Sequence, residues 1–282
     1  MKQILLDKEF IFTCTADKNY IDFIYSLSSS INANCPDIPL HIRLVNIHEN
    51  DKQIISAVIK ERNKNSIIEF DDKILSNNRK YFRSKDELLY GKSINDSLKI
   101  KRSSKTFKNV NNNYFLMSEQ QCYTSNTRFR NIIKLLEDGY NYVIYLDADT
   151  IVRKNIYDLK DILISYDLTC NINDCKRYSN NKCWELSFLG VKKSNRSIHF
   201  INQCKKLAEN DMLDWDSDQN SIEEIYSNNF KDLTVNSNIK YIEDIGQLHN
   251  KEHLTDSYIW AGSGFNKINN DKFINELEKY YE

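Results

Sequence analysis

Two aspartates that follow an apolar run are the strongest chemical feature of the sequence. Asp147 and Asp149 are separated only by Ala148 and come directly after residues 142–146, which are all apolar or aromatic. Two carboxylates held close together repel each other unless a proton or a cation lies between them. Oxygen ligands of this kind suit a hard divalent ion such as Mg²⁺ or Mn²⁺, which can bridge to the phosphates of a substrate. The pattern favours a metal site, and the alternative is a pair of acids that merely begins a loop.

The run before the acids has the composition of a buried strand. Residues 142–146 are β-branched, aromatic or Leu and carry no charge, which is typical of a strand covered on both faces of a parallel sheet. Open α/β sheets bind their ligands beyond the carboxyl ends of their strands. The sequence therefore places Asp147 and Asp149 in such a crevice, provided that the chain turns at Ala148.

The composition is that of a globular protein and argues against several classes. The chain has 282 residues, of which 40% are hydrophobic and 28% are charged, and its formal net charge is −1. This charge gives no reason to expect a nucleic acid or a membrane surface as a partner. No apolar stretch approaches the ~20 residues of a membrane span, and the charged start of the chain does not resemble a signal peptide. We therefore expect a cytoplasmic protein.

The seven cysteines are odd in number and scattered along the chain. Cys170, Cys175 and Cys183 come nearest to a cluster, but no second pair with zinc-type spacing accompanies them. We predict ordinary reduced thiols, as in a reducing compartment.

The N-terminal part shows the pattern of a β-α-β-α-β unit, an architecture that often binds nucleotides. Strands are predicted at residues 10–13, 40–45 and 66–70, and helices at about residues 20–32 and around residues 54–59. Neither the glycine-rich dinucleotide fingerprint nor a P-loop is present in the sequence.

Between about residues 71 and 121 the periodicity fades, and polar and basic residues dominate. A structureless loop of this length would be unusual in a compact domain. We predict an insertion of short helices and loops near the active site, and a surface elaboration specific to this protein is the alternative.

Helical periodicity returns at residues 129–136, where a helix is predicted. Gly139 would then take the position just after the end of this helix. Arg128 lies near the start of that helix, and arginine is suited to bidentate contact with phosphate or hydroxyl groups. A solvated helix face is the alternative, which we favour for Arg130 and not for Arg128.

Further elements are predicted after the two acids. A helix is expected at residues 156–166, strands at 167–170 and 186–191, and helices around 198–208 and after 215–220. Gly190 in the second of these strands would allow a substrate to approach the backbone.

Two more polar clusters are candidates for a site. Asp218 and Gln219 open a predicted helix, where Asp218 could be only an N-cap. Gly262 and Gly264 precede Lys267 in a chain that has only six glycines. Glycine-rich backbone with a nearby lysine can hold phosphates, and a plain turn is the alternative.

Taken in order, these motifs resemble those of GT-A-fold glycosyltransferases that use nucleotide-diphospho-sugars, and glycosyltransferase family 8 in particular. Thr15, Asp17, Asn19 and Tyr20 resemble the turn after the first strand, which implies contact with uracil and ribose. Arg128 resembles a basic residue of the family that precedes the strand leading to the metal site, which implies that Arg128 contacts the donor. The resemblance covers most of the chain but not the insertion at about 71–121.

The acids are similar to the family's D-x-D signature. Asp147 and Asp149 would then bind Mn²⁺ (or Mg²⁺) together with the donor diphosphate, and Ala148 would lie against the donor. Asp218 and Gln219 resemble an Asp-Gln pair near the transferred sugar, which implies that they act in catalysis.

The C-terminal motif departs from the family pattern. Gly264 and Lys267 resemble a Gly-x-x-Lys segment that closes on the diphosphate. The family usually has a histidine three residues before the motif's glycine, where this chain has Ile259 or Ala261. His249 is a candidate for the third metal ligand, and a water molecule in its place is the alternative that we favour.

The resemblance implies an α/β, GT-A (Rossmann-like) fold with a mixed, mostly parallel sheet flanked by helices, in a single domain over residues 1–282. It also implies transfer of a sugar, with retention, from a UDP-sugar to an unknown glycan, lipid or protein. Two alternatives stay open. One is a nucleotidyltransferase, although residues 16–19 are a poor match to the glycine-rich, basic loop of such enzymes. The other is a non-catalytic protein that binds sugar nucleotides.

Overall fold

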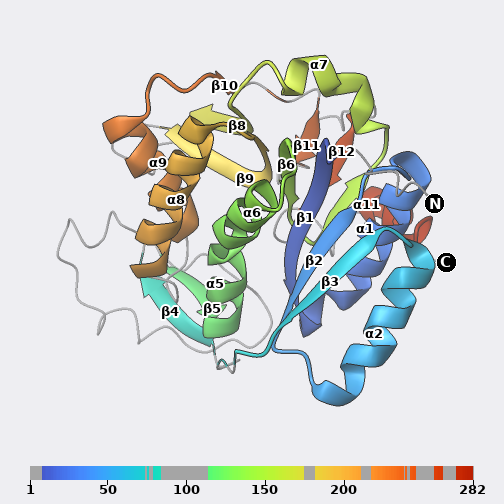
Figure 1. Cartoon of the computed structure of the whole chain (residues 1–282). Coiled ribbons are helices and arrows are strands. Elements are labelled where there is room, and N and C mark those ends of the chain that lie inside the picture. The colour runs from blue at the N-terminus through green and yellow to red at the C-terminus, as the bar shows by residue number, and fades with distance from the viewer. Residues whose placement is uncertain are drawn as a thin grey trace.

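A seven-stranded sheet forms the centre of the molecule (Figure 1). The computed structural model describes residues 8–73, 75, 79–83, 114–174, 182–210, 217–237, 239, 242–245, 257–262 and 271–281. Across the sheet the strands are β10 (Val235–Asn236), β8 (Leu168–Asp174), β9 (Lys182–Lys192), β6 (Tyr142–Leu146), β1 (Phe10–Asp17), β2 (Leu40–Val45) and β3 (Ser66–Asp71).

The sheet is mixed and mostly parallel, as the sequence predicts. Strands β6, β1, β2 and β3 run parallel to one another, β9 runs antiparallel to both β6 and β8, and β10 is parallel to β8. The predicted strands 10–13, 40–45, 66–70 and 142–146 correspond to β1, β2, β3 and β6, and β1 continues to Asp17.

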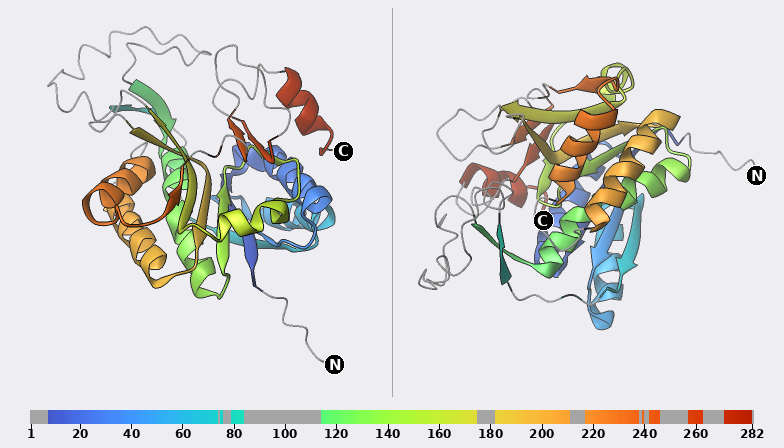
Figure 2. Two further views of the ribbon diagram at one scale, coloured as in Figure 1. Left: turned by 90° about the horizontal axis from the view of Figure 1, so that it is seen from above. Right: turned by 90° about the vertical axis from the view of Figure 1, so that its left-hand side faces the viewer.

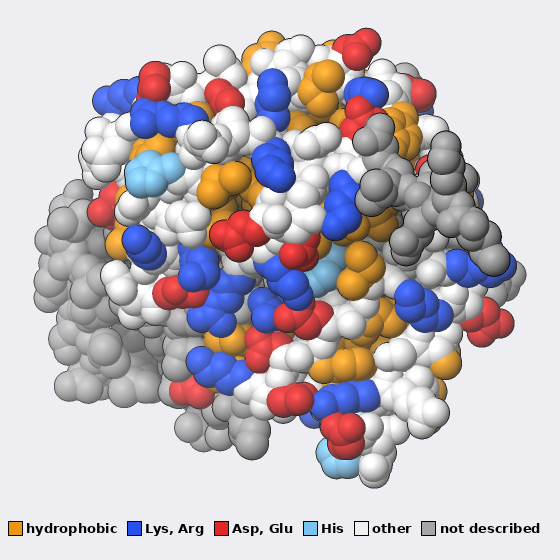
Figure 3. Space-filling view, viewed as in Figure 1, with side chains coloured by type: hydrophobic (Ala, Val, Ile, Leu, Met, Phe, Trp, Pro, Cys, Tyr) orange, Lys and Arg blue, Asp and Glu red, His pale blue; other side chains and the backbone are white. Residues whose placement is uncertain are grey.

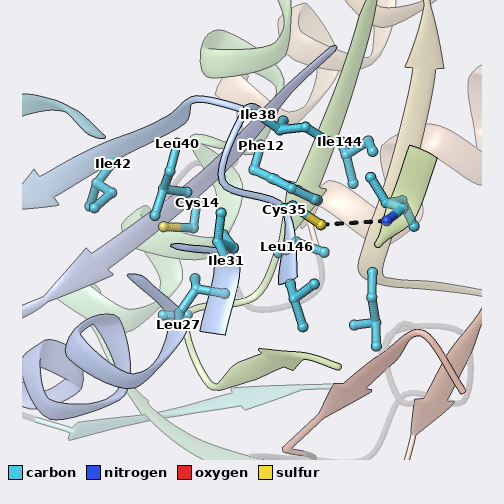
Figure 4. Packing of buried hydrophobic residues seen from close by; sticks show 14 of the residues in the cluster. Phe12, Cys14, Leu27, Ile31, Cys35, Ile38, Leu40, Ile42, Ile144 and Leu146 are labelled. Carbon is cyan, nitrogen blue, oxygen red and sulfur yellow. Dashed lines mark hydrogen bonds between the residues drawn. The ribbon is translucent and has the colours of Figure 1, made fainter. Parts of the chain in front are cut away.

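Helices cover both faces of this sheet because successive residues of its central strands point in opposite directions. Phe12, Cys14 and Ile144 pack with α1 (Ile21–Asn34) and α2 (Glu49–Arg62), as Figure 4 shows for part of that core. Ile11 and Val143 pack with the helices of the other face. These helices are α6 (Arg128–Glu137), α8 (Asn195–Asn210) and α9 (Ser217–Asn229), of which α8 and α9 lie side by side (Figure 2).

The end of α6 confirms the predicted role of Gly139, which has φ +107°. Its N–H donates to the carbonyl of Leu136 at 3.2 Å, and the N–H of Tyr140 donates to Leu135 at 3.2 Å. This pair of bonds is a Schellman motif, whose left-handed residue is usually glycine. The motif stops α6 and turns the chain into β6.

The first strand after the two acids belongs to a second, three-stranded sheet. Its strands are β7 (Thr150–Val152), β12 (Ile259–Ala261) and β11 (Glu243–Ile245), with β12 antiparallel to β7. The C-terminal helix α11 (Asp271–Glu278) packs Phe273 against Ile151 and Trp260. Segments from the middle and the end of the chain therefore meet beside the carboxyl end of β6.

At its two described ends, the predicted insertion of short helices and loops contains two strands that the sequence did not predict, followed by a short helix. Strands β4 (Arg79–Arg83) and β5 (Tyr114–Ser118) form a two-stranded antiparallel ribbon, and α5 (Glu119–Asn126) follows directly. Backbone pairing between distant segments leaves no local periodicity in the sequence. Residues 84–113 lie outside the described part of the chain.

The segment after β7 is helical, as predicted, but in two short pieces, a 3₁₀ turn η2 (Ile156–Leu159) and α7 (Lys160–Leu163). None of the helices in the described residues has the length and apolar character needed to cross a bilayer.

One face of the molecule carries mixed charges over α6, β2 and β3 (Figure 3). Arg43 lies 3.0 Å from a carboxylate oxygen of Glu69 and 3.5 Å from one of Asp71, and Lys134 lies 2.6 Å from Glu69. Partly exposed pairs of this kind contribute little stability individually, but Lys134 joins α6 to β3, and Arg43 joins β2 to β3.

Candidate active site

The two acids lie where the sheet presents the carboxyl ends of its central strands. Because β1 and β6 are parallel neighbours, Asp17 at the end of β1 and Asp147 after β6 are on the same edge. The chain turns at Ala148 and Asp149 before β7 begins. The side chain of Asp147 is 38% exposed, whereas Asp149 is only 5% exposed.

Backbone hydrogen bonds hold both acids from outside β6. The N–H of Asp147 donates to the carbonyl of Ser187 in β9 at 2.9 Å, and the carbonyl of Asp149 accepts the N–H of Gly262 at 2.8 Å. Three separate segments of the chain thus set the positions of the carboxylates.

Arg128, the first residue of α6, is the central cation of the site. Its Nε lies 2.7 Å from Oδ2 of Asp218, and its Nη2 lies 3.7 Å from Oδ1 of Asp147. It also donates to the carbonyl of Leu186 and lies over the ring of Tyr145, 4.8 Å from the centroid. A buried charge is costly unless it is paired, so Arg128 and Asp218 each require the other.

Asp218 lies within the first turn of α9 and not before it, so the interpretation as an N-cap is wrong. Its Oδ1 accepts the N–H of Gln219 at 2.8 Å, and its own N–H donates to Oδ1 of Asn126 at 3.0 Å. The partly buried Gln219 follows directly on the helix. Asp218 is therefore held by its side chain and its backbone at once.

Asn126, the last residue of α5, is not among the residues predicted from the sequence. The signal was present, because Ser118 and Gln121 form a capping box at the start of α5, with hydrogen bonds of 3.1 and 3.0 Å. A serine three residues before a glutamine marks a helix start, and helix α5 places Asn126 beside the start of α9.

Asp17 is almost fully buried, at 1% exposure. Its Oδ1 accepts the N–H of Asn19 at 2.8 Å and so caps the 3₁₀ turn η1 (Lys18–Tyr20). Burial raises the pKa of the Asp17 carboxyl above its ordinary value, although hydrogen bonds from Asn19 and Gln120 oppose this shift. The carboxylate thus shapes the turn that carries Asn19 and Tyr20.

Thr15 is buried as well, and its hydroxyl is engaged on the α6 side of the sheet. Its Oγ1 accepts a hydrogen bond from Nδ2 of Asn131 at 2.9 Å, and Oδ1 of Asn131 accepts one from Arg43 at 3.1 Å. A ligand at this strand end would therefore meet the backbone of Thr15 and not its hydroxyl.

Two buried groups near the acids are chemically inert. Burial, and secondarily the charge of Asp147, raise the pKa of the Cys14 thiol far above its ordinary value. Burial also raises the pKa of the Tyr145 hydroxyl. Both groups stay protonated at neutral pH, so neither is a nucleophile or a base.

The described free cysteines are all buried, and Cys170 packs in the core on the α6 face of the sheet. This agrees with ordinary thiols for the described cysteines. The side chains of Cys175 and Cys183 lie outside the described residues.

The predicted role of Gly190 in substrate approach is wrong. Gly190 lies within β9, where an added Cβ would collide with the ring of Tyr142. The Tyr142 hydroxyl donates to Oγ1 of Thr169 at 3.0 Å inside the core. The glycine therefore makes room for a buried tyrosine of the neighbouring strand.

The two acids would offer a metal ion hard oxygen ligands. Asp147 and Asp149 supply two carboxylates, and within the described ranges no group of three or more His, Cys, Asp or Glu residues that could hold a metal is found. Ile259 and Ala261 are buried apolar residues of β12 and cannot coordinate an ion. Two carboxylates with open positions for phosphate and water fit Mn²⁺ or Mg²⁺.

Three candidates from the sequence, His249, Gly264 and Lys267, lie outside the described residues. The described structure brings together Asp147, Asp149, Arg128, Asp218 and Gln219, and it places the turn of Asp17, Asn19 and Tyr20 on the same edge of the sheet. These residues come from β1, η1, α6, α9 and the turn between β6 and β7.

Solved structures of glycosyltransferases are similar to this chain. The galactosyltransferase LgtC in complex with donor and acceptor sugar analogues is 16% identical, with a TM-score of 0.52 over 96% of this chain and 95% of that chain. GlyE of Streptococcus pneumoniae TIGR4 is 12% identical, with a TM-score of 0.55 over 97% of this chain and 61% of GlyE. At such identities the likeness shows a shared fold, which is the GT-A fold.

The sequence comparisons point the same way. No curated protein matches the chain significantly. The model of "Glycosyl transferase family 8" matches residues 11–196, which include most of β1, all of β6 and the two acids Asp147 and Asp149. The chain therefore belongs to glycosyltransferase family 8 and is a glycosyltransferase, an enzyme that transfers sugars.

Proposed function

We propose that the protein transfers a sugar from a UDP-sugar to a glycan, lipid or protein acceptor, using Mn²⁺ or Mg²⁺ and retaining the anomeric configuration. The arrangement around Arg128 is the main support. This buried guanidinium lies 3.7 Å from Asp147 of the proposed metal pair and 2.7 Å from Asp218 beside Gln219. The diphosphate and the sugar of one donor would then bind on either side of Arg128.

The leaving group of this reaction is a nucleoside diphosphate, on which negative charge develops as the bond to the sugar breaks. Asp147 and Asp149 would hold the metal ion, which when bound neutralises that charge as a Lewis acid. Arg128, whose Nη2 lies 3.7 Å from Oδ1 of Asp147, would help to hold that carboxylate in place. Gly264 and Lys267 are proposed as further contacts to the diphosphate on the evidence of the sequence alone.

The transferred sugar would lie against the start of α9. Its reacting carbon passes through an oxocarbenium-like state, as in glycoside hydrolysis. Gln219 is proposed to face this carbon, because Asp218 accepts its N–H at 2.8 Å and is itself held by Arg128. Asp218 would thus act mainly by fixing the start of α9.

The base and ribose of the donor would bind at the end of β1. Asp17 caps the turn η1 with its buried carboxylate, and Asn19 and Tyr20 lie on that turn. In this proposal Asn19 and the backbone near Thr15 contact the nucleoside, while Tyr20 packs beside it. Membership of family 8 sets aside both the nucleotidyltransferase and the non-catalytic alternative.

A donor panel tests the proposed function directly. The protein is incubated with UDP-sugars and GDP-sugars, each with Mn²⁺ and with a chelator, and the released nucleotide is measured. We expect release from at least one UDP-sugar that requires the divalent ion. Release that is equal with and without the chelator would contradict the metal-dependent mechanism.

We expect the wild-type protein to bind UDP more tightly than GDP and Asp17→Ala to reduce this preference by about tenfold. A site that hydrogen-bonds its ligand rejects analogues that lack the matching groups, and ~1.4 kcal/mol of lost preference is tenfold in affinity. Without its cap, η1 would no longer hold Asn19 in place. Calorimetry with both nucleotides measures the preference.

Asp37→Ala, at an exposed aspartate outside the proposed site, is the matched control and should keep the wild-type preference. Equal affinity of the wild-type protein for UDP and GDP would show that the turn does not read the base.

A further inference from the structure

Gly262 lies in a narrow space between the second acid and the C-terminal helix. Its N–H donates to the carbonyl of Asp149 at 2.8 Å. A Cβ at this position would lie 2.8 Å from Cζ of Phe273 and 3.0 Å from the carbonyl oxygen of Asp149. The backbone of Asp149 and the ring of Phe273 therefore both border the space that a side chain at position 262 would occupy.

Phe273 belongs to a small aromatic cluster apart from the two main cores. It is 1% exposed, and its ring packs edge-on against Trp260 at 5.1 Å between centroids. Trp260 is paired with Ile151, and Ala261 with Thr150, in the ladder between β12 and β7. Continuing this antiparallel register by one residue brings Gly262 opposite Asp149.

The helix that carries Phe273 is itself anchored to the N-terminal part of the fold. Asn34 of α1 donates to the hydroxyl of Tyr280 at 3.2 Å, and Arg62 of α2 donates to the carbonyl of Tyr280 at 3.0 Å. The hydroxyl of Tyr281 donates to Asp22 of α1 at 3.1 Å. These bonds hold α11 against α1, and Figure 1 shows the two helices together behind the sheet.

We propose that α11 positions the second metal carboxylate, with Phe273 and Gly262 as positioning residues that act through the backbone of Asp149. The inference rests on the proposed role of Asp149 as a metal ligand. Groups that orient a ligand without touching the metal commonly change metal affinity by about 10–100-fold when altered. The contact also explains the need for glycine, because any larger residue must displace either the ring or the carboxylate-bearing turn.

Four variants test this role: Gly262→Ala, Phe273→Leu, the double variant of these two, and Phe200→Leu. Phe200 is a matched control, because it is buried in α8 and packs edge-on against Phe230 at 5.2 Å, far along the chain from the acids. Mn²⁺ affinity in the presence of UDP is measured by electron paramagnetic resonance, and thermal unfolding is followed by circular dichroism.

We expect Gly262→Ala and Phe273→Leu each to weaken Mn²⁺ binding by about tenfold, at the low end of the effect of such supporting groups. The double variant should bind Mn²⁺ no more weakly than Gly262→Ala, because the smaller leucine leaves room for the added methyl group. Phe200→Leu should lower the unfolding midpoint comparably to Phe273→Leu and leave Mn²⁺ affinity unchanged.

Unchanged Mn²⁺ affinity in both single variants, with Mn²⁺-dependent UDP binding in the wild type, would overturn this inference alone. The same holds if Phe200→Leu weakens Mn²⁺ binding as much as Phe273→Leu does, since the effect would then reflect general destabilisation. A wild-type protein whose UDP binding ignores Mn²⁺ would overturn the proposed function and this inference with it.

Discussion

Replacing either acid of the metal pair by its amide is expected to lower kcat/KM by about a hundredfold to a thousandfold, comparable to removing one group that stabilises developing charge. Asp147→Asn and Asp149→Asn keep the shape of the side chain but remove a negative charge from the proposed metal site. UDP binding should then lose most of its dependence on Mn²⁺. Calorimetric titration of UDP, with and without Mn²⁺, measures this together with steady-state kinetics.

The two variants should differ in their effect on folding. Asp147 is partly exposed, so Asp147→Asn should fold like the wild type. Asp149 is only 5% exposed and closely packed, so Asp149→Asn should be the less stable of the two variants. Asp138→Asn, at an exposed acid directly after α6, serves as the control and should leave both activity and Mn²⁺ dependence intact. UDP binding of equal strength in the wild type and both variants, with or without Mn²⁺, would refute the metal assignment.

Replacing Arg128 by methionine is expected to lower the free energy of unfolding by about 3–5 kcal/mol, because it leaves a buried charge without its partner. Asp218 is 3% exposed and lies 2.7 Å from the guanidinium. The same change should abolish measurable transfer, since Asp147 and the start of α9 lose their common contact. Urea unfolding followed by circular dichroism measures the stability.

Arg130→Met is the matched control on the same helix. Arg130 pairs with Glu209 at 2.6 Å, but its side chain is 32% exposed, and a pair of this exposure contributes about 0–1 kcal/mol. The double variant Arg128→Met/Asp218→Asn should recover much of the lost stability, because the unpaired charge is gone, without recovering activity. Equal stability losses for Arg128→Met and Arg130→Met would show that burial of the ion pair does not matter.

Local patterns were sufficient to predict the central strands and the place of the two acids. The apolar run at β6 and the alternating residues of β2 report burial that each strand experiences over its whole length, so periodicity alone identifies them. Gly139 was predicted for a similar reason, because the end of a helix depends on the backbone freedom of one residue. The motif order then pointed to the family that the comparisons show.

The contacts that complete the candidate site arise only when distant segments pack together. Asn126 and Asp218 are 92 positions apart, yet the N–H of Asp218 donates to Oδ1 of Asn126 at 3.0 Å. From the sequence, Gly190 was expected to let a substrate approach the backbone, but in the fold Tyr142 of the neighbouring strand occupies the space beside it. Gly262 likewise has no room for a side chain because Phe273 and the carbonyl of Asp149 lie beside it. Spacing along the chain records burial and turns, whereas the partner of a buried charge or a glycine is chosen by which elements the fold brings into contact.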